Sequence, residues 1–89
     1  MDEVFKAGVQ SLANNNNPVT YEFENLAKNI LKGELKRKGV TYAQLVEKLA
    51  AIGVVDSERN LNNKISRGGF TGAFLLQCLV AIGVTDLRI

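Results

Sequence analysis

The sequence contains no histidine and no tryptophan, and it contains a single cysteine among its 89 residues. Histidine is the commonest general base and the commonest metal ligand in proteins, so its absence argues against most catalytic and metal sites. One cysteine, Cys78, cannot form an internal disulfide or a metal cluster. We therefore predict no enzyme activity, no cofactor and no metal, and a reducing compartment, the cytoplasm.

Long apolar runs are also missing from the chain. No stretch approaches the roughly 20 apolar residues that cross a bilayer, and the acidic start, Met1 to Glu3, is unlike a secretion signal. What is present is ordinary for one globular domain, with 46% hydrophobic and 22% charged residues. The sequence predicts no membrane association.

The apolar residues recur at helical spacing in four segments, near residues 20–38, 41–52, 57–67 and 72–82, and no strand is predicted. Residues 1–19 are interpreted as an N-terminal arm ending in an asparagine-rich linker, and residues 20–89 as the helical domain. The fold class is thus all-α, a compact four-helix helix-turn-helix bundle with an N-terminal arm. Its predicted core residues are Leu31, Leu35, Leu45, Leu49, Leu61, Ile65, Phe74 and Leu79.

Capping residues predict where these helices begin and end. Thr20 is the expected N-cap of the first helix, and Thr41 with Gln44 forms a capping box for the second. Gly53 and Gly83 end the second and fourth helices inside a repeated Ala-Ile-Gly-Val phrase. Two sets of residues are expected to face inward: Phe23, Leu26, Ala27, Ile30, Leu31 and Leu35 in the first helix, and Leu45, Leu49 and Ile52 in the second.

The third helix is short and has little apolar surface. With Leu61 and Ile65 against the core, Arg59 and Asn63 point outward, flanked by Asn60, Ser66 and Arg67. Arginine and asparagine read guanine and adenine edges in the major groove, so the pattern is typical of a DNA recognition helix. The alternative is a surface helix with generic polar residues.

Basic residues gather on two segments although the net charge is only +2. One group consists of Lys28, Lys32, Lys36, Arg37 and Lys38, and the other of Arg59, Lys64 and Arg67. Such groups indicate a polyanionic partner, or else a solvated face that confers solubility.

Residues 39–49 resemble the second helix of the lambda-repressor/Cro (Xre-like) helix-turn-helix class, and residues 65–68 resemble the end of its recognition helix. More closely, residues 26–89 resemble a small uncharacterised family of bacterial domains, through the phrases at 35–42 and 60–68. One departure is that the interval between Leu49 and Gly68 is roughly six residues longer than in the class. Another is that Leu61 and Ile65 are four residues apart, whereas the class usually spaces this pair by three.

The helix-turn-helix resemblance implies roles for particular residues. Base contacts would come from Arg59, Asn60 and Asn63, and contacts with the DNA backbone from Lys36, Lys38, Tyr42, Gln44, Lys64 and Arg67. The predicted function is a sequence-specific DNA-binding module, a small bacterial or phage transcription regulator. The alternative is a protein–protein interaction module on a similar scaffold, such as an adaptor, an antitoxin-like partner or a phage-encoded inhibitor.

A homodimer is also predicted, because helix-turn-helix regulators commonly bind two half-sites of an operator. The apolar residues available for such pairing are Val4, Phe5, Val9 and Leu12 in the arm, and Leu87 and Ile89 at the C-terminal end.

Overall fold

A computed structural model of the chain describes residues 17–89. Four α-helices account for this part of the protein: α2 (Pro18–Lys38), α3 (Tyr42–Ala51), α4 (Glu58–Arg67) and α5 (Gly72–Ala81). The predicted all-α, four-helix class is confirmed. None of the helices within residues 17–89 is both long and apolar enough to span a membrane.

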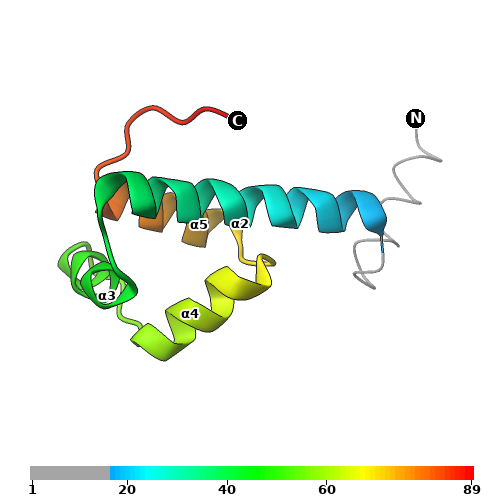
Figure 1. The fold of residues 1–89 in the computed structure, drawn as a ribbon. Helices are drawn as coiled ribbons and strands as arrows, with labels where there is room; N and C mark the ends of the chain where they lie inside the picture. The colour runs from blue at the N-terminus through cyan, green and yellow to red at the C-terminus, as the bar shows by residue number, and fades with distance from the viewer. Residues whose placement is uncertain (1–16) are drawn as a thin grey trace.

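The helices surround one core. In Figure 1, α2 and α5 run side by side, α4 packs against α2, and α3 packs against α4 and α5. Every residue predicted for the core is buried, together with Cys78 and Ile82. The N-terminal part of α2 extends beyond the other helices (Figure 1).

The start of α2 differs from the prediction, which placed the N-cap at Thr20. The N-cap is Asn17, whose side-chain oxygen accepts hydrogen bonds from the backbone N–H groups of Val19 and Thr20 at 2.8 and 3.4 Å. Pro18 is the first helical residue, where its missing N–H is not needed and its fixed φ suits a helix. The N-cap therefore lies three residues earlier than predicted, inside the segment interpreted as linker. The rest of the predicted arm, residues 1–16, lies outside the described residues.

The other caps follow the prediction. Thr41 Oγ1 accepts from the N–H of Gln44 at 3.1 Å, and Gln44 Oε1 accepts from the N–H of Thr41 at 2.9 Å, which completes the capping box. Gly53 and Gly83 both have positive φ, and the residue after each donates its N–H to a carbonyl of the preceding helix at 2.9 Å. The repeated phrase thus encodes the same helix ending twice, a Schellman-type turn.

Three inward-facing assignments are wrong. Ile52 is 45% exposed, because Val54 folds back and packs against the core at the end of α3. In α2, Leu31 and Leu35 are buried, whereas Phe23 is 64% and Leu26 is 38% exposed. The apolar residues of α2 therefore form two stripes, since they occupy more of the helix circumference than one packed face can cover.

The end of α4 lies very close to α2. A Cβ atom added at Gly68 would lie 2.9 Å from the backbone oxygen of Glu24 and 3.3 Å from the Cβ of Lys28. Gly68 also has a φ of +80°, which disfavours any side chain. Glycine at this position therefore both ends α4 and lets its last turn rest on α2.

We expect Phe74→Ala to lower the free energy of unfolding by about 3–5 kcal/mol, because Phe74 is buried and its ring packs 5.4 Å from the ring of Phe70. Leu76→Ala, on the exposed side of the same helix, is the control and should change stability by less than about 0.5 kcal/mol. Urea denaturation measures both. A loss below about 1 kcal/mol for Phe74→Ala would show that this ring is not part of the core.

We expect Gly68→Ala to destabilise the protein more than Gly53→Ala. Both positions have positive φ, so each substitution should cost about 1–2 kcal/mol in backbone strain. Only at Gly68 does the new methyl group meet backbone atoms, since a Cβ at Gly53 has nothing within 4 Å. Equal losses in thermal or chemical unfolding would contradict the close approach of α4 to α2.

Candidate nucleic-acid interface

The candidate interface centres on α4, which is held by a small number of contacts. Leu61 and Ile65 are fully buried and are the only buried residues within this helix. Ser57 caps its start by accepting the N–H of Asn60 at 3.1 Å, and Gly68 caps its end. Leu61 and Ile65 lie one turn apart and fix the helix to the core. Most of the helix circumference is therefore exposed to solvent.

The outward side of α4 is polar and open. The side chains of Arg59, Asn63 and Arg67 are exposed, and within residues 17–89 they form no hydrogen bond or ion pair. No described residue therefore occupies the donors of these three side chains. Ser66 is exposed on the same side, but its hydroxyl donates to Asn62 Oδ1 at 3.1 Å.

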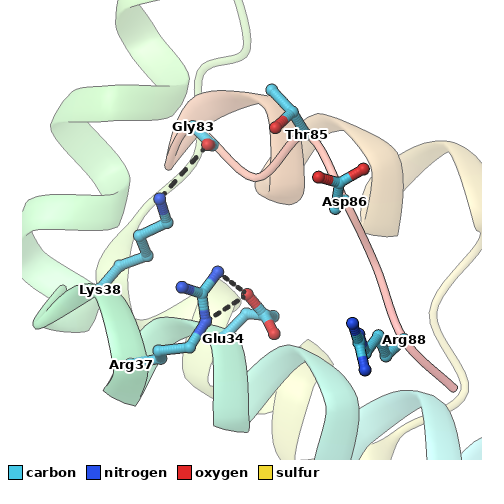
Figure 2. Close-up of a pocket in the computed structure, with 7 residues that line it drawn as sticks. All are labelled: Glu34, Arg37, Lys38, Gly83, Thr85, Asp86 and Arg88. Atoms are coloured by element: carbon cyan, nitrogen blue, oxygen red, sulfur yellow. Dashed lines mark hydrogen bonds and ion pairs between the residues drawn. The ribbon is translucent and has the colours of Figure 1, made fainter.

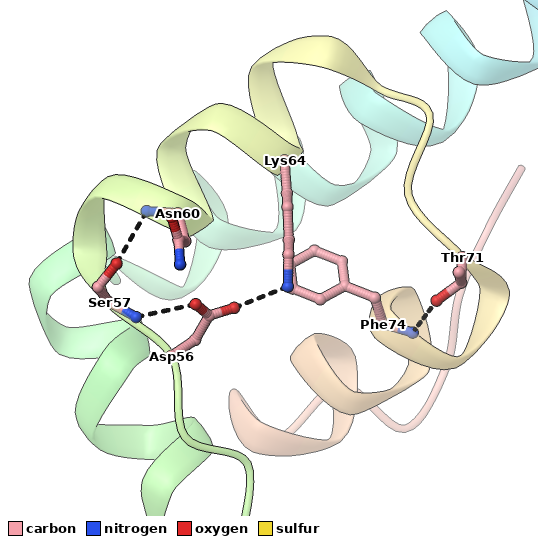
Figure 3. Close-up of polar contacts among 6 residues, drawn as sticks. All are labelled: Asp56, Ser57, Asn60, Lys64, Thr71 and Phe74. Atoms are coloured by element: carbon pink, nitrogen blue, oxygen red, sulfur yellow. Dashed lines mark hydrogen bonds and ion pairs between the residues drawn. The ribbon is translucent and has the colours of Figure 1, made fainter.

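Lys64 differs from these residues because it already has a partner. Its ammonium lies 2.8 Å from Asp56 Oδ2 and 5.1 Å from the centre of the Phe74 ring, which belongs to α5 (Figure 3). The Asp56 side chain is only 10% exposed. The hydrogen bond from Lys64 lowers the pKa of Asp56, although partial burial opposes this, and contacts from Ser57 and Asn60 add to the lowering. The side chain of Lys64 thus ties α4 to the preceding loop and to α5.

Asn60 is intermediate between the exposed residues of the outward side and the paired Lys64. It is exposed, but its side chain is on the Asp56 side of α4, as Figure 3 shows, and it helps to keep the Asp56 carboxylate charged. Of the three residues predicted to contact bases, Arg59 and Asn63 therefore face fully outward and Asn60 lies at the edge.

Two of the predicted backbone-contacting residues meet where α2 approaches α3. Tyr42 and Lys36 line a shallow hollow together with Lys32. Tyr42 is half-buried, and this burial raises the pKa of its phenol, so it is a neutral hydroxyl at neutral pH. Two lysines beside a phenolic hydroxyl offer donors that suit a phosphate.

The remaining two, Lys38 and Gln44, line a different hollow that also includes Lys48. Gln44 Oε1 is occupied by the capping box, which leaves its NH₂ group available to donate. Lys38 Nζ donates to the backbone oxygen of Gly83 at 3.3 Å, at the C-terminal end of α5. It faces a basin that lies between the end of α2 and the C-terminal segment (Figure 2).

That basin has charges of both signs. Arg37 donates from Nε and Nη2 to Glu34 Oε1 at 3.1 and 2.6 Å, which raises the pKa of Arg37, while Asp86 and Arg88 lie across from them (Figure 2). Two acidic and three basic side chains line the basin. The basin is therefore a weaker candidate for binding a polyanion than the face of α4.

The structure holds two functional features that the site prediction missed. Lys32 lines the same hollow as Lys36 and Tyr42. In the sequence, only its place in the first basic group pointed to this residue. The partner of Lys64 is Asp56, eight residues earlier and outside the helix. No regular spacing signals such a pair, because it depends on how the loop before α4 folds.

Among residues 17–89, no three His, Cys, Asp or Glu side chains come together as a metal site. Burial raises the pKa of the Cys78 thiol to about 11, so the sulfur stays protonated and behaves as a small apolar group.

The fold and the surface of α4 define an all-α domain with an exposed polar helix. Residues 23–87 match the family described as Domain of unknown function (DUF6471), and the chain belongs to this family. The predicted membership of an uncharacterised family is therefore confirmed. This match does not connect the chain with the lambda-repressor/Cro class, so that part of the resemblance stays a prediction. No curated protein and no solved structure matches the chain.

We expect Asp56→Asn to lower the free energy of unfolding by about 1 kcal/mol at neutral pH, because it removes the charge that holds Lys64. Folding lowers the pKa of Asp56 below its ordinary value of 3.8, so its contribution is present above pH 3.8 and is lost as the pH falls through the lowered value. Chemical denaturation from pH 7 to pH 2 should show the two proteins converging in acid. A constant difference across this range would contradict the assignment.

Proposed function

We propose that the chain is a sequence-specific DNA-binding module, a small bacterial or phage transcription regulator that acts in the cytoplasm. The observation that carries the proposal is the outward side of α4. There, Arg59, Asn63 and Arg67 are exposed and have no partner within residues 17–89, on a helix whose position is fixed by buried leucine and isoleucine. A rigid helix with free arginine and asparagine donors suits the edges of bases in a major groove.

Each residue has a role in this proposal that follows from its position. Arg59 and Asn63 read base edges, with Asn60 at the margin of the contact. Arg67, one turn from Asn63, binds the DNA backbone near the C-terminal end of α4. Lys36 and Tyr42, with Lys32, bind a phosphate through the hollow beside the start of α3.

Two of the predicted backbone contacts have reduced parts in this proposal. Lys64 has to leave Asp56 before it can bind a phosphate, and Lys38 already donates to Gly83. We therefore expect both to contribute less to DNA affinity than Arg67. Gln44 retains its NH₂ donors for a phosphate next to Thr41.

A second candidate function is a protein–protein interaction module, and it has an observation in its favour. Large apolar side chains are exposed on two helices, with Leu76 and Val80 on α5 more than 60% exposed in addition to those of α2. Exposed apolar patches are typical of protein interfaces.

We expect Arg59→Ala to relax the preference at one base position and to cost about 1–3 kcal/mol of binding to the preferred DNA. Arg67→Ala should instead weaken binding to all sequences alike and reduce the salt slope by about one. The measurement is binding of each variant to a selected DNA pool at two salt concentrations.

Arg88→Ala is the matched control, because it removes the same side chain from the mixed-charge basin instead of from α4. It should leave specificity unchanged. If the wild-type protein shows no salt-dependent DNA binding even at low ionic strength, the proposal is wrong and the outward side of α4 belongs to a protein partner.

A further inference from the structure

The helix α2 has a second apolar stripe that faces away from the core. Val19, Phe23 and Leu26 are 58%, 64% and 38% exposed, and Ile30 is half-buried. On a helix these four positions lie within about 60° of one another. The buried residues Leu31 and Leu35 lie roughly 130° around the helix from them. The stripe therefore has no covering element within residues 17–89.

The spacing of this outer stripe is that of a coiled coil. Its members are separated by four, three and four residues, which is the alternation of a heptad repeat. The next position in the series is Gly33, and the one after it is Arg37, which is paired with Glu34. The apolar stripe thus runs from Val19 to Gly33, over about four helical turns.

Gly33 is the informative member of the stripe. Glycine weakens the interior of a helix, and Gly33 sits well inside α2. A Cβ added there would have nothing within 4 Å, so no described part of the chain requires a glycine. A glycine on a helix surface allows another chain to approach the backbone closely.

We propose that two copies of the chain pair through the outer stripes of α2, with the helices antiparallel. In this arrangement Phe23 of one copy packs over Gly33 of the other, and Leu26 packs against Ile30. The large ring then fills the space left by the glycine at both ends of the contact. A parallel pair would set Phe23 against Phe23 and Gly33 against Gly33, which leaves a gap at one end.

Charges beside the stripe favour the same arrangement. Glu22 and Lys36 lie on one flank of the stripe, two heptads apart, with Asn29 midway between them. Both charged side chains are exposed and neither is in an ion pair within residues 17–89. In the antiparallel register Glu22 of each copy faces Lys36 of the other, so the pair forms twice. The parallel register does not bring these residues together.

Pairing through the outer stripe leaves α4 uncovered. The end of α4 meets α2 at Glu24 and Lys28, which lie on the side of the helix away from Phe23 and Leu26. The two proposals share only Lys36, and the dimer is tested without DNA. An interface of about four turns from each copy lies at the small end of specific interfaces, roughly 1,000 Å², so we expect association in the micromolar range.

The test is sedimentation equilibrium of the full chain over a series of concentrations, without DNA. We expect a reversible dimer whose dissociation constant rises at least about tenfold in Phe23→Gln. Tyr21→Gln is the matched control, because Tyr21 is equally exposed on the same helix but lies opposite the stripe. Circular dichroism checks that each variant keeps its helices.

Charge reversal tests the orientation. Glu22→Lys and Lys36→Glu should each weaken the dimer several-fold, and the double variant should restore it, because both intermolecular pairs then re-form with their signs exchanged. Gly33→Gln improves helix propensity but blocks the place of Phe23, so it should weaken the dimer without unfolding the chain.

Three results would overturn the proposal. The first is a monomer at every concentration, which is also the result expected if residues 1–16 cover the stripe of their own chain. The second is a dimer that Phe23→Gln does not weaken. The third is a double charge reversal that does not restore association. A monomer that binds DNA would contradict only the dimer proposal. A dimer that binds no DNA would contradict only the DNA-binding proposal.

Discussion

The burial of Leu61 and Ile65, which holds α4 against the core, is the contact on which the rest of the molecule depends. These two side chains are fully buried among residues of the other three helices, so they fix the helix without using its polar residues. Gly68 adds a close approach of the last turn to α2. A helix held in this way presents a rigid polar surface, so less conformational entropy is lost when it binds a partner.

The basic residues fall into two groups, those with an acceptor within the described fold and those without one. Lys64, Arg37 and Lys38 each have an acceptor within the fold, namely Asp56, Glu34 and the carbonyl of Gly83. Arg59 and Arg67 have none within residues 17–89. Of the nine acidic residues in the sequence, Glu34 and Asp56 supply the two ion pairs among residues 17–89. Surface pairs of this kind contribute little to stability but decide which cations can bind an external anion.

Local signals in the sequence predicted the elements of the fold well. The capping box of Thr41 and Gln44, the positive-φ glycines and the core leucines follow from patterns that span only a few residues. The outward direction of Arg59 and Asn63 also follows from helix geometry once Leu61 and Ile65 are assigned to the core.

Features that depend on tertiary arrangement were not predictable in this way. Helical spacing does not show which apolar residues of α2 find a neighbour, so it predicts one inward face that includes Phe23 and Leu26, although both are exposed. The pairing of Lys64 with Asp56 depends on the path of the loop before α4. At the start of α2, the strong N-cap at Asn17 and the favourable position of Pro18 outweighed Thr20, which is a weaker candidate because the chain is already helical there.

We propose nucleic-acid recognition by the outward side of α4, and chemical-shift mapping tests this proposal most directly. The measurement is NMR titration of the isotope-labelled full chain with DNA from a binding selection, first at low and then at higher ionic strength. The account predicts that the largest changes occur at Arg59, Asn63 and Arg67 and that they diminish as salt is added. Changes confined to other surfaces, such as that of Leu76 and Val80, or no changes at any DNA concentration, would contradict it.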